Sequence, residues 1–125
     1  MDSATRSVFV VDDDDAVRDS LKTLLELQSF AVSTFETCQD FLSSDFAGAA
    51  CLVLDIHLPG MSGLELMDAL KRDKRSLPTI LITARCDNAI RDRARALGAV
   101  ALLEKPIDFN GLMTAIDRCV KQSSA

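Results

Sequence analysis

Four consecutive aspartates, Asp12 to Asp15, follow directly on the apolar run Val8 to Val11. A short β-branched run of this kind is typical of a buried strand. Carboxylates gathered where such a strand ends repel one another and lose water, so their charge has to be compensated. A bound divalent cation and the N-terminus of a following helix could each do this. Asp14 or Asp15 alone would be enough to cap a helix. Four aspartates exceed what a cap requires, so a metal site remains an alternative explanation.

Three further residues could take part in the same chemistry, because each follows or ends an apolar run: Asp55, Thr83 and Lys105. Taken singly, they are typical of a turn aspartate, a β-branched strand residue and a solvated lysine. Together they offer carboxylate oxygens that suit Mg²⁺, with an ammonium and a hydroxyl that suit phosphoryl oxygens. This combination describes a phosphoryl-transfer site in which an aspartate is the nucleophile.

The elements that must bring these residues together are five strand-like runs alternating with five segments of helical spacing. We expect the strands at Val8–Asp12, Ala31–Phe35, Cys51–Asp55, Thr79–Thr83 and Val100–Glu104. The helical stripes are Val17/Leu21/Leu24/Leu25, Cys38/Phe41/Leu42, Leu66/Met67/Leu70, Ile90/Ala94/Leu97 and Leu112/Ile116/Cys119/Val120. Ser62 and Glu65 predict a capping box, and Gly98 predicts a helix end. The alternation predicts an α/β fold with a parallel sheet, whose carboxyl edge would bind the ligand.

Composition narrows the class of protein. A length of 125 residues with 48% hydrophobic residues suits a single domain over residues 1–125, with an ordered core at about residues 7–121. The sequence holds no apolar run of about 18 residues, so we expect no membrane span. A net charge of −5 disfavours direct nucleic-acid binding by this domain.

Cysteine usage indicates the compartment. The four cysteines form no C-x-x-C pair, and the single histidine, His57, is remote from them in sequence, so zinc is not expected. We expect reduced, mostly buried thiols and a cytoplasmic protein.

The sequence resembles the receiver domains of two-component response regulators over nearly its whole length. The matching residues are Asp12 and Asp13 in VFVVDDDDAVRDSL, Asp55 in CLVLDIHLPGMSGLEL, Thr83 in ILITA and Lys105 in LLEKP. The sequence around Asp55 is most similar to that of FixJ-type regulators, whose receivers usually precede a DNA-binding output domain.

The resemblance implies a (βα)5 doubly wound, five-stranded parallel sheet of the flavodoxin/CheY-like, three-layer α/β/α type. It implies that Asp55 accepts a phosphoryl group from a sensor histidine kinase, which changes the signalling face. It also implies Mg²⁺ (or Mn²⁺) bound by Asp12, Asp13, Asp55 and the backbone carbonyl of His57. Lys105 would contact the phosphoryl group, Thr83 would turn towards it, and the Lys105–Pro106 peptide would be cis. A homodimer through the last helices and strand is a further expectation.

Three features depart from the family pattern. Leu102 occupies the switch position three residues before the lysine, where receivers usually carry Phe or Tyr. Arg85 lies in a bulkier, charged segment after the threonine, and with His57 it would alter water access and phosphoryl lifetime. The third feature is a set of arginines in the fourth helix, which is either a solvated face or a surface for an acidic partner or dimer: Arg91, Arg93 and Arg95.

Other readings remain open on the residues alone. A Mg²⁺-dependent phosphatase of the haloacid dehalogenase type also places a nucleophilic aspartate after a strand, but it needs a second aspartate where this sequence has His57. A flavodoxin-like FMN protein is a further alternative, but this sequence has no Trp or Tyr to stack on the flavin. An interaction module that never takes phosphate would not need all five site residues. We therefore expect a switch that catalyses only its own phosphorylation and dephosphorylation.

Overall fold

The computed structural model describes residues 6–123, and the residues outside this range include the two ends of the expected 1–125 domain. Strands and helices alternate along the chain. The strands are β1 (Ser7–Val11), β2 (Ala31–Phe35), β3 (Cys51–Asp55), β4 (Thr79–Thr83) and β5 (Ala101–Glu104). The helices are α1 (Asp15–Leu27), α2 (Cys38–Leu42), α3 (Gly63–Arg72), α4 (Asn88–Ala96) and α5 (Phe109–Ser123).

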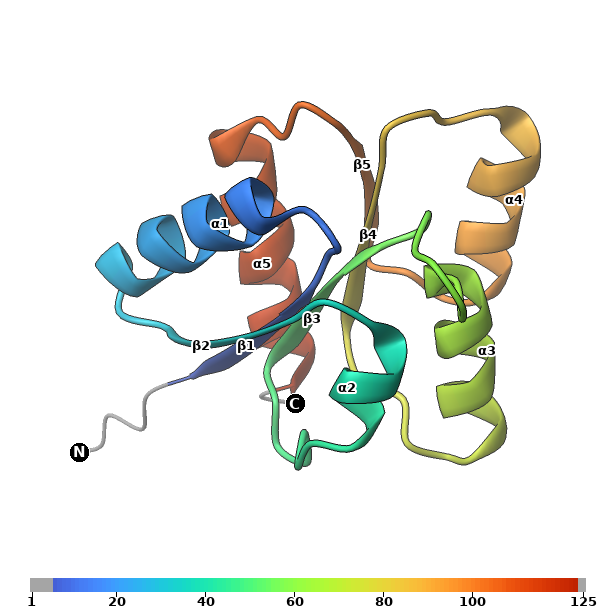
Figure 1. Cartoon of the computed structure of the whole chain (residues 1–125), viewed down its shortest axis with the longest axis horizontal. Helices are drawn as coiled ribbons and strands as arrows, with labels where there is room; N and C mark the ends of the chain where they lie inside the picture. Colours follow the sequence, from blue (N-terminus) through green and yellow to red (C-terminus); the bar gives the residue numbers. More distant parts are fainter. Residues whose placement is uncertain (1–5, 124–125) are drawn as a thin grey trace.

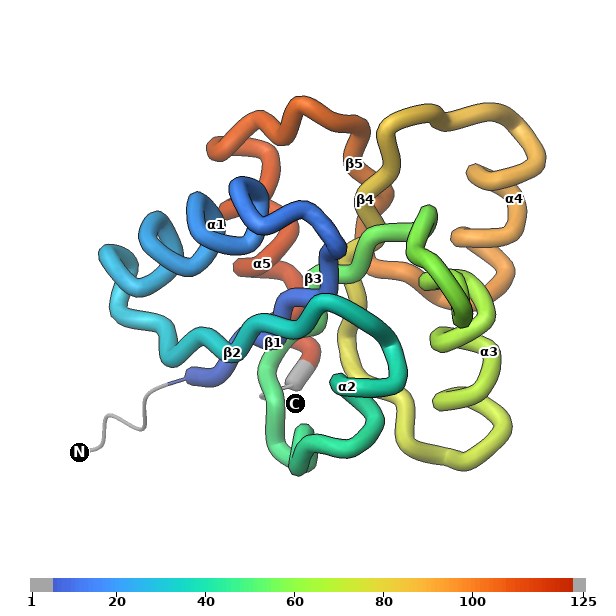
Figure 2. Tube along the Cα trace, in the orientation of Figure 1, coloured from blue at the N-terminus to red at the C-terminus, as the bar shows by residue number. Residues whose placement is uncertain are grey.

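The five strands form one parallel sheet in the order β2-β1-β3-β4-β5. Helices cover both faces of this sheet, α1 and α5 on one and α2, α3 and α4 on the other (Figure 1). The trace in Figure 2 shows the same doubly wound path, with the three central strands between the two helical layers. The predicted α/β fold class is confirmed.

Alternating side chains of the strands build two cores. Val8 and Val10 of β1 lie in the cluster with α1 and α5, while Phe9 and Val11 lie in the cluster with α2, α3 and α4. This follows from the two-residue period of a strand, which points successive side chains to opposite faces. Because β3 and β4 are buried at every residue, they hold the residues at their ends rigidly.

Local hydrogen bonds explain where the helices begin and end. Ser62 and Glu65 form the predicted capping box at the start of α3, with both reciprocal hydrogen bonds present. Gly98 follows α4 with a φ of 83°, a left-handed conformation that glycine adopts without steric penalty. At the start of α1 the N-cap is Asp14, which resolves the choice left open between Asp14 and Asp15.

Three strand boundaries differ from the prediction by one residue. β1 begins at Ser7 rather than Val8, because Ser7 already pairs with Ala31 of β2. β1 ends at Val11 rather than Asp12, because the Asp12 carboxylate accepts a hydrogen bond from the Asp14 backbone N–H and the chain turns there. β5 begins at Ala101 rather than Val100, although the Val100 N–H still donates to the Thr79 carbonyl at 2.8 Å.

The cysteines follow the expected burial. Cys38, Cys51 and Cys119 are buried, Cys86 is half-buried, and all four are free thiols. Within residues 6–123, no helix is long and apolar enough to cross a bilayer.

Candidate functional site

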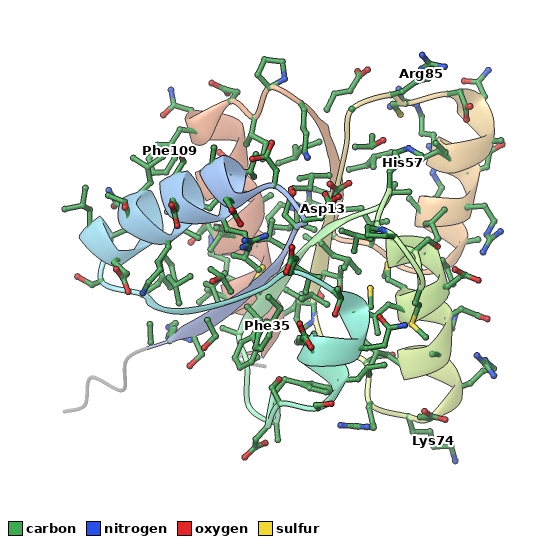
Figure 3. All side chains as sticks on the ribbon, viewed as in Figure 1. Asp13, Phe35, His57, Lys74, Arg85 and Phe109 are labelled. Carbon is green, nitrogen blue, oxygen red and sulfur yellow. The ribbon has the colours of Figure 1, made fainter. Side chains whose placement is uncertain are left out.

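The carboxyl ends of four neighbouring strands bring the predicted site residues to one edge of the sheet. Asp12 follows β1, Asp55 ends β3, Thr83 ends β4 and Lys105 follows β5. The strand order places β1, β3, β4 and β5 side by side, so residues distant in sequence become neighbours. Figure 3 shows Asp13, His57 and Arg85 at this end of the molecule, with Lys74 at the opposite end.

Three carboxylates meet at this edge. Asp12, Asp13 and Asp55 each offer an oxygen, and these atoms all lie within 4.8 Å of one another. Asp12 is fully buried and Asp55 is only 3% exposed, whereas Asp13 is exposed to solvent. One oxygen of each buried carboxylate accepts a backbone hydrogen bond, Asp12 from Asp14 at 2.9 Å and Asp55 from His57 at 3.0 Å. The second oxygen of each buried carboxylate does not take part in these backbone bonds and lies against the Lys105 ammonium.

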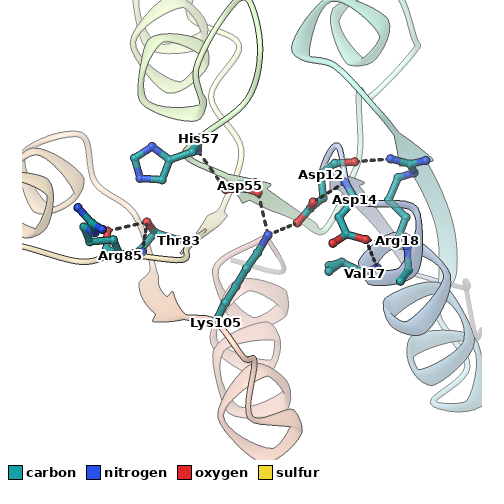
Figure 4. Close-up of polar contacts among 10 residues, drawn as sticks. Asp12, Asp14, Val17, Arg18, Asp55, His57, Thr83, Arg85 and Lys105 are labelled. Carbon is teal, nitrogen blue, oxygen red and sulfur yellow. Dashed lines mark hydrogen bonds and ion pairs between the residues drawn. The ribbon is translucent and has the colours of Figure 1, made fainter.

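Lys105 contacts both buried carboxylates. Its Nζ atom lies 2.9 Å from Oδ2 of Asp55 and 3.1 Å from Oδ2 of Asp12 (Figure 4). The contact with Asp55 is a hydrogen bond, but Oδ2 of Asp12 is buried and accepts no hydrogen bond of good geometry. One ammonium beside three carboxylates leaves excess negative charge at the site.

The pKa values reflect this crowding. Burial raises the pKa of Asp12 above its ordinary value of 3.8, and the nearby Asp55 charge adds to the rise, although the Asp14 N–H and Lys105 oppose it. For Lys105, burial lowers the pKa, but the hydrogen bond to Asp55 and the close negative charges of Asp55 and Asp12 outweigh it, so its pKa is raised above 10.5. The lysine therefore stays protonated and the site keeps a fixed cation.

The donor set suits a hard divalent cation. All three side-chain ligands are carboxylate oxygens, without sulfur or nitrogen, and two of them are held by backbone hydrogen bonds. The buried Oδ2 of Asp12 has no hydrogen-bond donor, and a metal ion bound to this oxygen would compensate for the missing donor. The residues at this edge therefore fit Mg²⁺ or Mn²⁺.

Thr83 lies at the expected strand end, but its hydroxyl is engaged elsewhere. Its Oγ1 donates to the Arg85 carbonyl at 2.8 Å and accepts from the Arg85 N–H at 3.1 Å. The hydroxyl would have to exchange these bonds to reach a group on Asp55. Thr83 is thus positioned by its strand and restrained by the loop that follows.

The remaining predicted positions surround this site. The Lys105–Pro106 peptide bond is cis. Leu102 on β5 is half-buried and packs against the core cluster shared with α4. His57 is exposed at the edge, and the role of its carbonyl as a metal ligand stays a prediction.

Two residues of the site were not singled out by sequence reasoning. A Cβ atom on Gly63 would lie 2.4 Å from the Asp55 carbonyl oxygen, so only glycine allows α3 to approach the end of β3 this closely. Arg18 reaches back from α1 and donates to the Asp12 carbonyl at 2.6 Å. The glycine beside the Ser62 cap and the i, i+3 spacing of Asp15 and Arg18 were the available signals.

A comparison with protein families identifies this arrangement. The response regulator receiver domain matches residues 8–117. The chain belongs to the response regulator receiver family. Receiver domains are phosphoacceptor signalling switches that partner with histidine kinases. The phosphatase alternative finds no support, because the family match and the similar proteins are response regulators.

The chain is similar to proteins that are named as transcriptional regulators. It is 35% identical to the transcriptional regulatory protein FixJ of Bradyrhizobium diazoefficiens over 117 residues, covering 93% of this chain and 57% of that protein. It is 40% identical to the transcriptional regulatory protein TdiR of Thauera aromatica over 112 residues, covering 89% of this chain and 49% of that protein. The chain thus spans about half the length of these relatives.

Solved structures agree with the fold. The response regulator StyR superposes with a TM-score of 0.89 at 38% identity, covering 97% of this chain and 62% of that one. The FixJ-N structure gives a TM-score of 0.83 at 34% identity, covering 95% and 96% of the two chains. The expected FixJ-type receiver is confirmed.

Proposed function

We propose that Asp55 is the phosphoacceptor of this receiver domain. Its carboxylate contacts the Lys105 ammonium at 2.9 Å and has an oxygen within 4.8 Å of oxygens of Asp12 and Asp13, which is the observation that carries the assignment. A carboxylate oxygen would attack the phosphorus atom of a phosphohistidine, the P–N bond would break, and the imidazole would leave. The backbone N–H of His57 holds one oxygen of Asp55 at 3.0 Å and so limits rotation of the nucleophile.

We propose Asp12, Asp13, Asp55 and the His57 carbonyl as the ligands of Mg²⁺ or Mn²⁺. The bound ion would neutralise carboxylate charge and the developing charge on phosphoryl oxygens. Asp12 and Asp55 are buried and held by hydrogen bonds, so they would supply fixed ligands. Asp13 is exposed and would complete the site from the solvent side.

Lys105 and Thr83 would respond to the transferred group. The Lys105 ammonium contacts Asp55 and would move its hydrogen bond to a phosphoryl oxygen. Thr83 would exchange its two hydrogen bonds with Arg85 for one to the phosphoryl group, which pulls the β4–α4 loop. Leu102, smaller than the aromatic residue usual in receivers, would transmit this movement with a smaller displacement. Dephosphorylation would be a property of the same site.

A sensor histidine kinase is the proposed phosphoryl donor. An apolar cavity of about 510 Å³ borders Lys105 between α1 and the start of α5, lined in part by Leu21, Pro106 and Phe109. It offers a surface for a donor protein directly beside the acceptor. Since free thiols are typical of reducing compartments, we place this exchange in the cytoplasm.

The output belongs to a longer protein. The relatives are named transcriptional regulators and are about twice as long as the matched region, so we propose a C-terminal DNA-binding output domain in the parent protein. The receiver itself would not contact DNA, since its net charge is −5. Phosphorylation would favour a homodimer through the last helices and β5.

Labelling with acetyl phosphate and Mg²⁺ tests the assignment. We expect intact-mass spectrometry to detect one added phosphoryl group on the native domain and none on Asp55→Asn. The matched control is Asp19→Asn, because Asp19 is an exposed aspartate on α1 that should not affect labelling. Equal labelling of Asp55→Asn and the native domain would refute the assignment.

A further inference from the structure

Arg18 connects the first turn of α1 to the end of β1. Its Nη1 atom donates to the backbone carbonyl of Asp12 at 2.6 Å (Figure 4). Its Nη2 atom pairs with the carboxylate of Asp15. The side chain is only 15% exposed, unlike the other arginine and lysine side chains in helix ion pairs of residues 6–123. Its guanidinium is therefore held against the turn that carries the acidic cluster.

The contact closes a chain of interactions through the aspartate run. The Asp14 N–H donates to Oδ1 of Asp12, and the Asp14 carboxylate in turn accepts from the N–H groups of Ala16 and Val17. Asp15 anchors Arg18, which returns to the Asp12 carbonyl. Side-chain contacts thus link the residue that follows β1 to the first turn of α1.

The hydrogen bond from Arg18 uses the backbone carbonyl of Asp12 and neither of its carboxylate oxygens. Lys105, in contrast, contacts the carboxylate oxygens of Asp12 and Asp55. Arg18 can therefore orient a metal-binding residue without competing for the ligand atoms. The planar guanidinium presents donors in a fixed fork, which allows one side chain to hold Asp12 and Asp15 together.

We infer that Arg18 is a positioning residue for the divalent cation, which it does not touch. By restraining the β1–α1 turn, it holds the carboxylates of Asp12 and Asp13 where they converge with Asp55. This inference rests on the proposed metal site. Residues that orient metal ligands from the outer shell typically change affinity by about 10–100-fold when they are removed.

Calorimetric titration with MgCl₂ at constant ionic strength provides the test. We expect Arg18→Met to weaken Mg²⁺ binding by about 10-fold, since it keeps the apolar stem but loses both contacts. Arg18→Lys should recover part of the affinity, because an ammonium can reach one of the two acceptors. The matched control is Lys22→Met, which breaks the exposed Lys22–Glu26 pair one turn further along α1 and should change affinity less than about twofold.

Two more measurements separate positioning from loss of stability. At saturating Mg²⁺, labelling of Arg18→Met by acetyl phosphate should return to near the native rate, because Asp55 and Lys105 are unchanged. Hydrogen exchange of the metal-free variant should accelerate at the Asp14 amide, which donates to Asp12, while the strand amides of β3 stay protected. If Arg18→Met does not fold, Asp15→Asn provides a second variant, because it removes the ion pair of Arg18 but keeps the Arg18 side chain. This variant should also weaken Mg²⁺ binding.

The outcomes are distinguishable. Native-like Mg²⁺ affinity in Arg18→Met or in Asp15→Asn, whether or not urea stability falls, would overturn the positioning role. Native protein that binds no Mg²⁺ would overturn the metal site itself and this inference with it. A labelling rate of Arg18→Met that stays low at saturating Mg²⁺ would also contradict a role confined to metal affinity.

Discussion

Gly63 offers a sharp test of how the fold supports the site. In Gly63→Ala the new Cβ atom would lie 2.4 Å from the Asp55 carbonyl oxygen and 3.0 Å from both the Asp55 carbonyl carbon and the Ile56 Cα atom. All three atoms belong to the backbone at the end of β3, where no flexible side chain can give way. Either α3 or the end of β3 must therefore move.

Two opposing effects set the size of the change. Alanine favours a helix over glycine by about 1 kcal/mol in a helix interior, and Gly63 is the first residue of α3, where this gain is smaller. Overpacking of a close contact costs about 1–3 kcal/mol. The clash should dominate, so we expect Gly63→Ala to lower the free energy of unfolding by about 1–2 kcal/mol.

The same displacement should affect the chemistry, because the carbonyl that the new Cβ atom would meet belongs to Asp55. A misplacement of about 1 Å in a catalytic group can slow a reaction by about 100-fold, so labelling by acetyl phosphate should slow measurably. Urea denaturation and a labelling time course with intact-mass detection measure the two effects.

Gly111→Ala is the matched control. Its Cβ atom would meet only the side chain of Asp108, at 3.3 Å or more, and that carboxylate can adjust. We expect this variant to keep the native labelling rate and to lose no stability. Native stability together with a native labelling rate in Gly63→Ala would refute the packing argument.

Three other changes test separate parts of the structure. Asp14→Ala should destabilise the domain by about 0.5–2 kcal/mol in urea because it removes the α1 cap, and a larger loss in Asp15→Ala would contradict this assignment. Burial raises the pKa of the Cys38 thiol to about 11, so little reactive thiolate forms there at about pH 8. Iodoacetamide should therefore alkylate the half-buried Cys86 in the folded domain and Cys38 only in urea, which peptide mass mapping can measure. Lys105→Met should tighten Mg²⁺ binding in calorimetry, because the ammonium competes with the ion for the same carboxylates. Labelling of this variant should slow. Weaker Mg²⁺ binding would contradict the expected competition.

The strands and helices could be predicted because their signals are local. The β-branched runs at β1 and β3, and the helical stripe of α1, show their periods within a few residues. The capping box of Ser62 and Glu65 is likewise a relation between near neighbours. Boundary errors of one residue arose at Ser7, Asp12 and Val100, where strand pairing and the adjoining turns compete.

The approximate place of the site also followed from sequence. Parallel strands end at the same edge of a sheet, so residues at strand ends must gather there whatever the details of packing. The sequence therefore predicts that Asp12, Asp55, Thr83 and Lys105 lie together. The resemblance to receiver domains added the expected roles of these residues.

The sequence by itself thus determined the fold class, the strand ends and the chemistry available at one edge of the sheet. Only the tertiary structure decided which aspartate caps α1: Asp14 is the cap, whereas Asp15 anchors Arg18. It also decided that Thr83 is bonded to the next loop rather than to Asp55. The physical reason is that periodicity and strand ends are set by neighbouring residues, whereas burial and hydrogen-bond partners depend on distances between elements that only packing fixes.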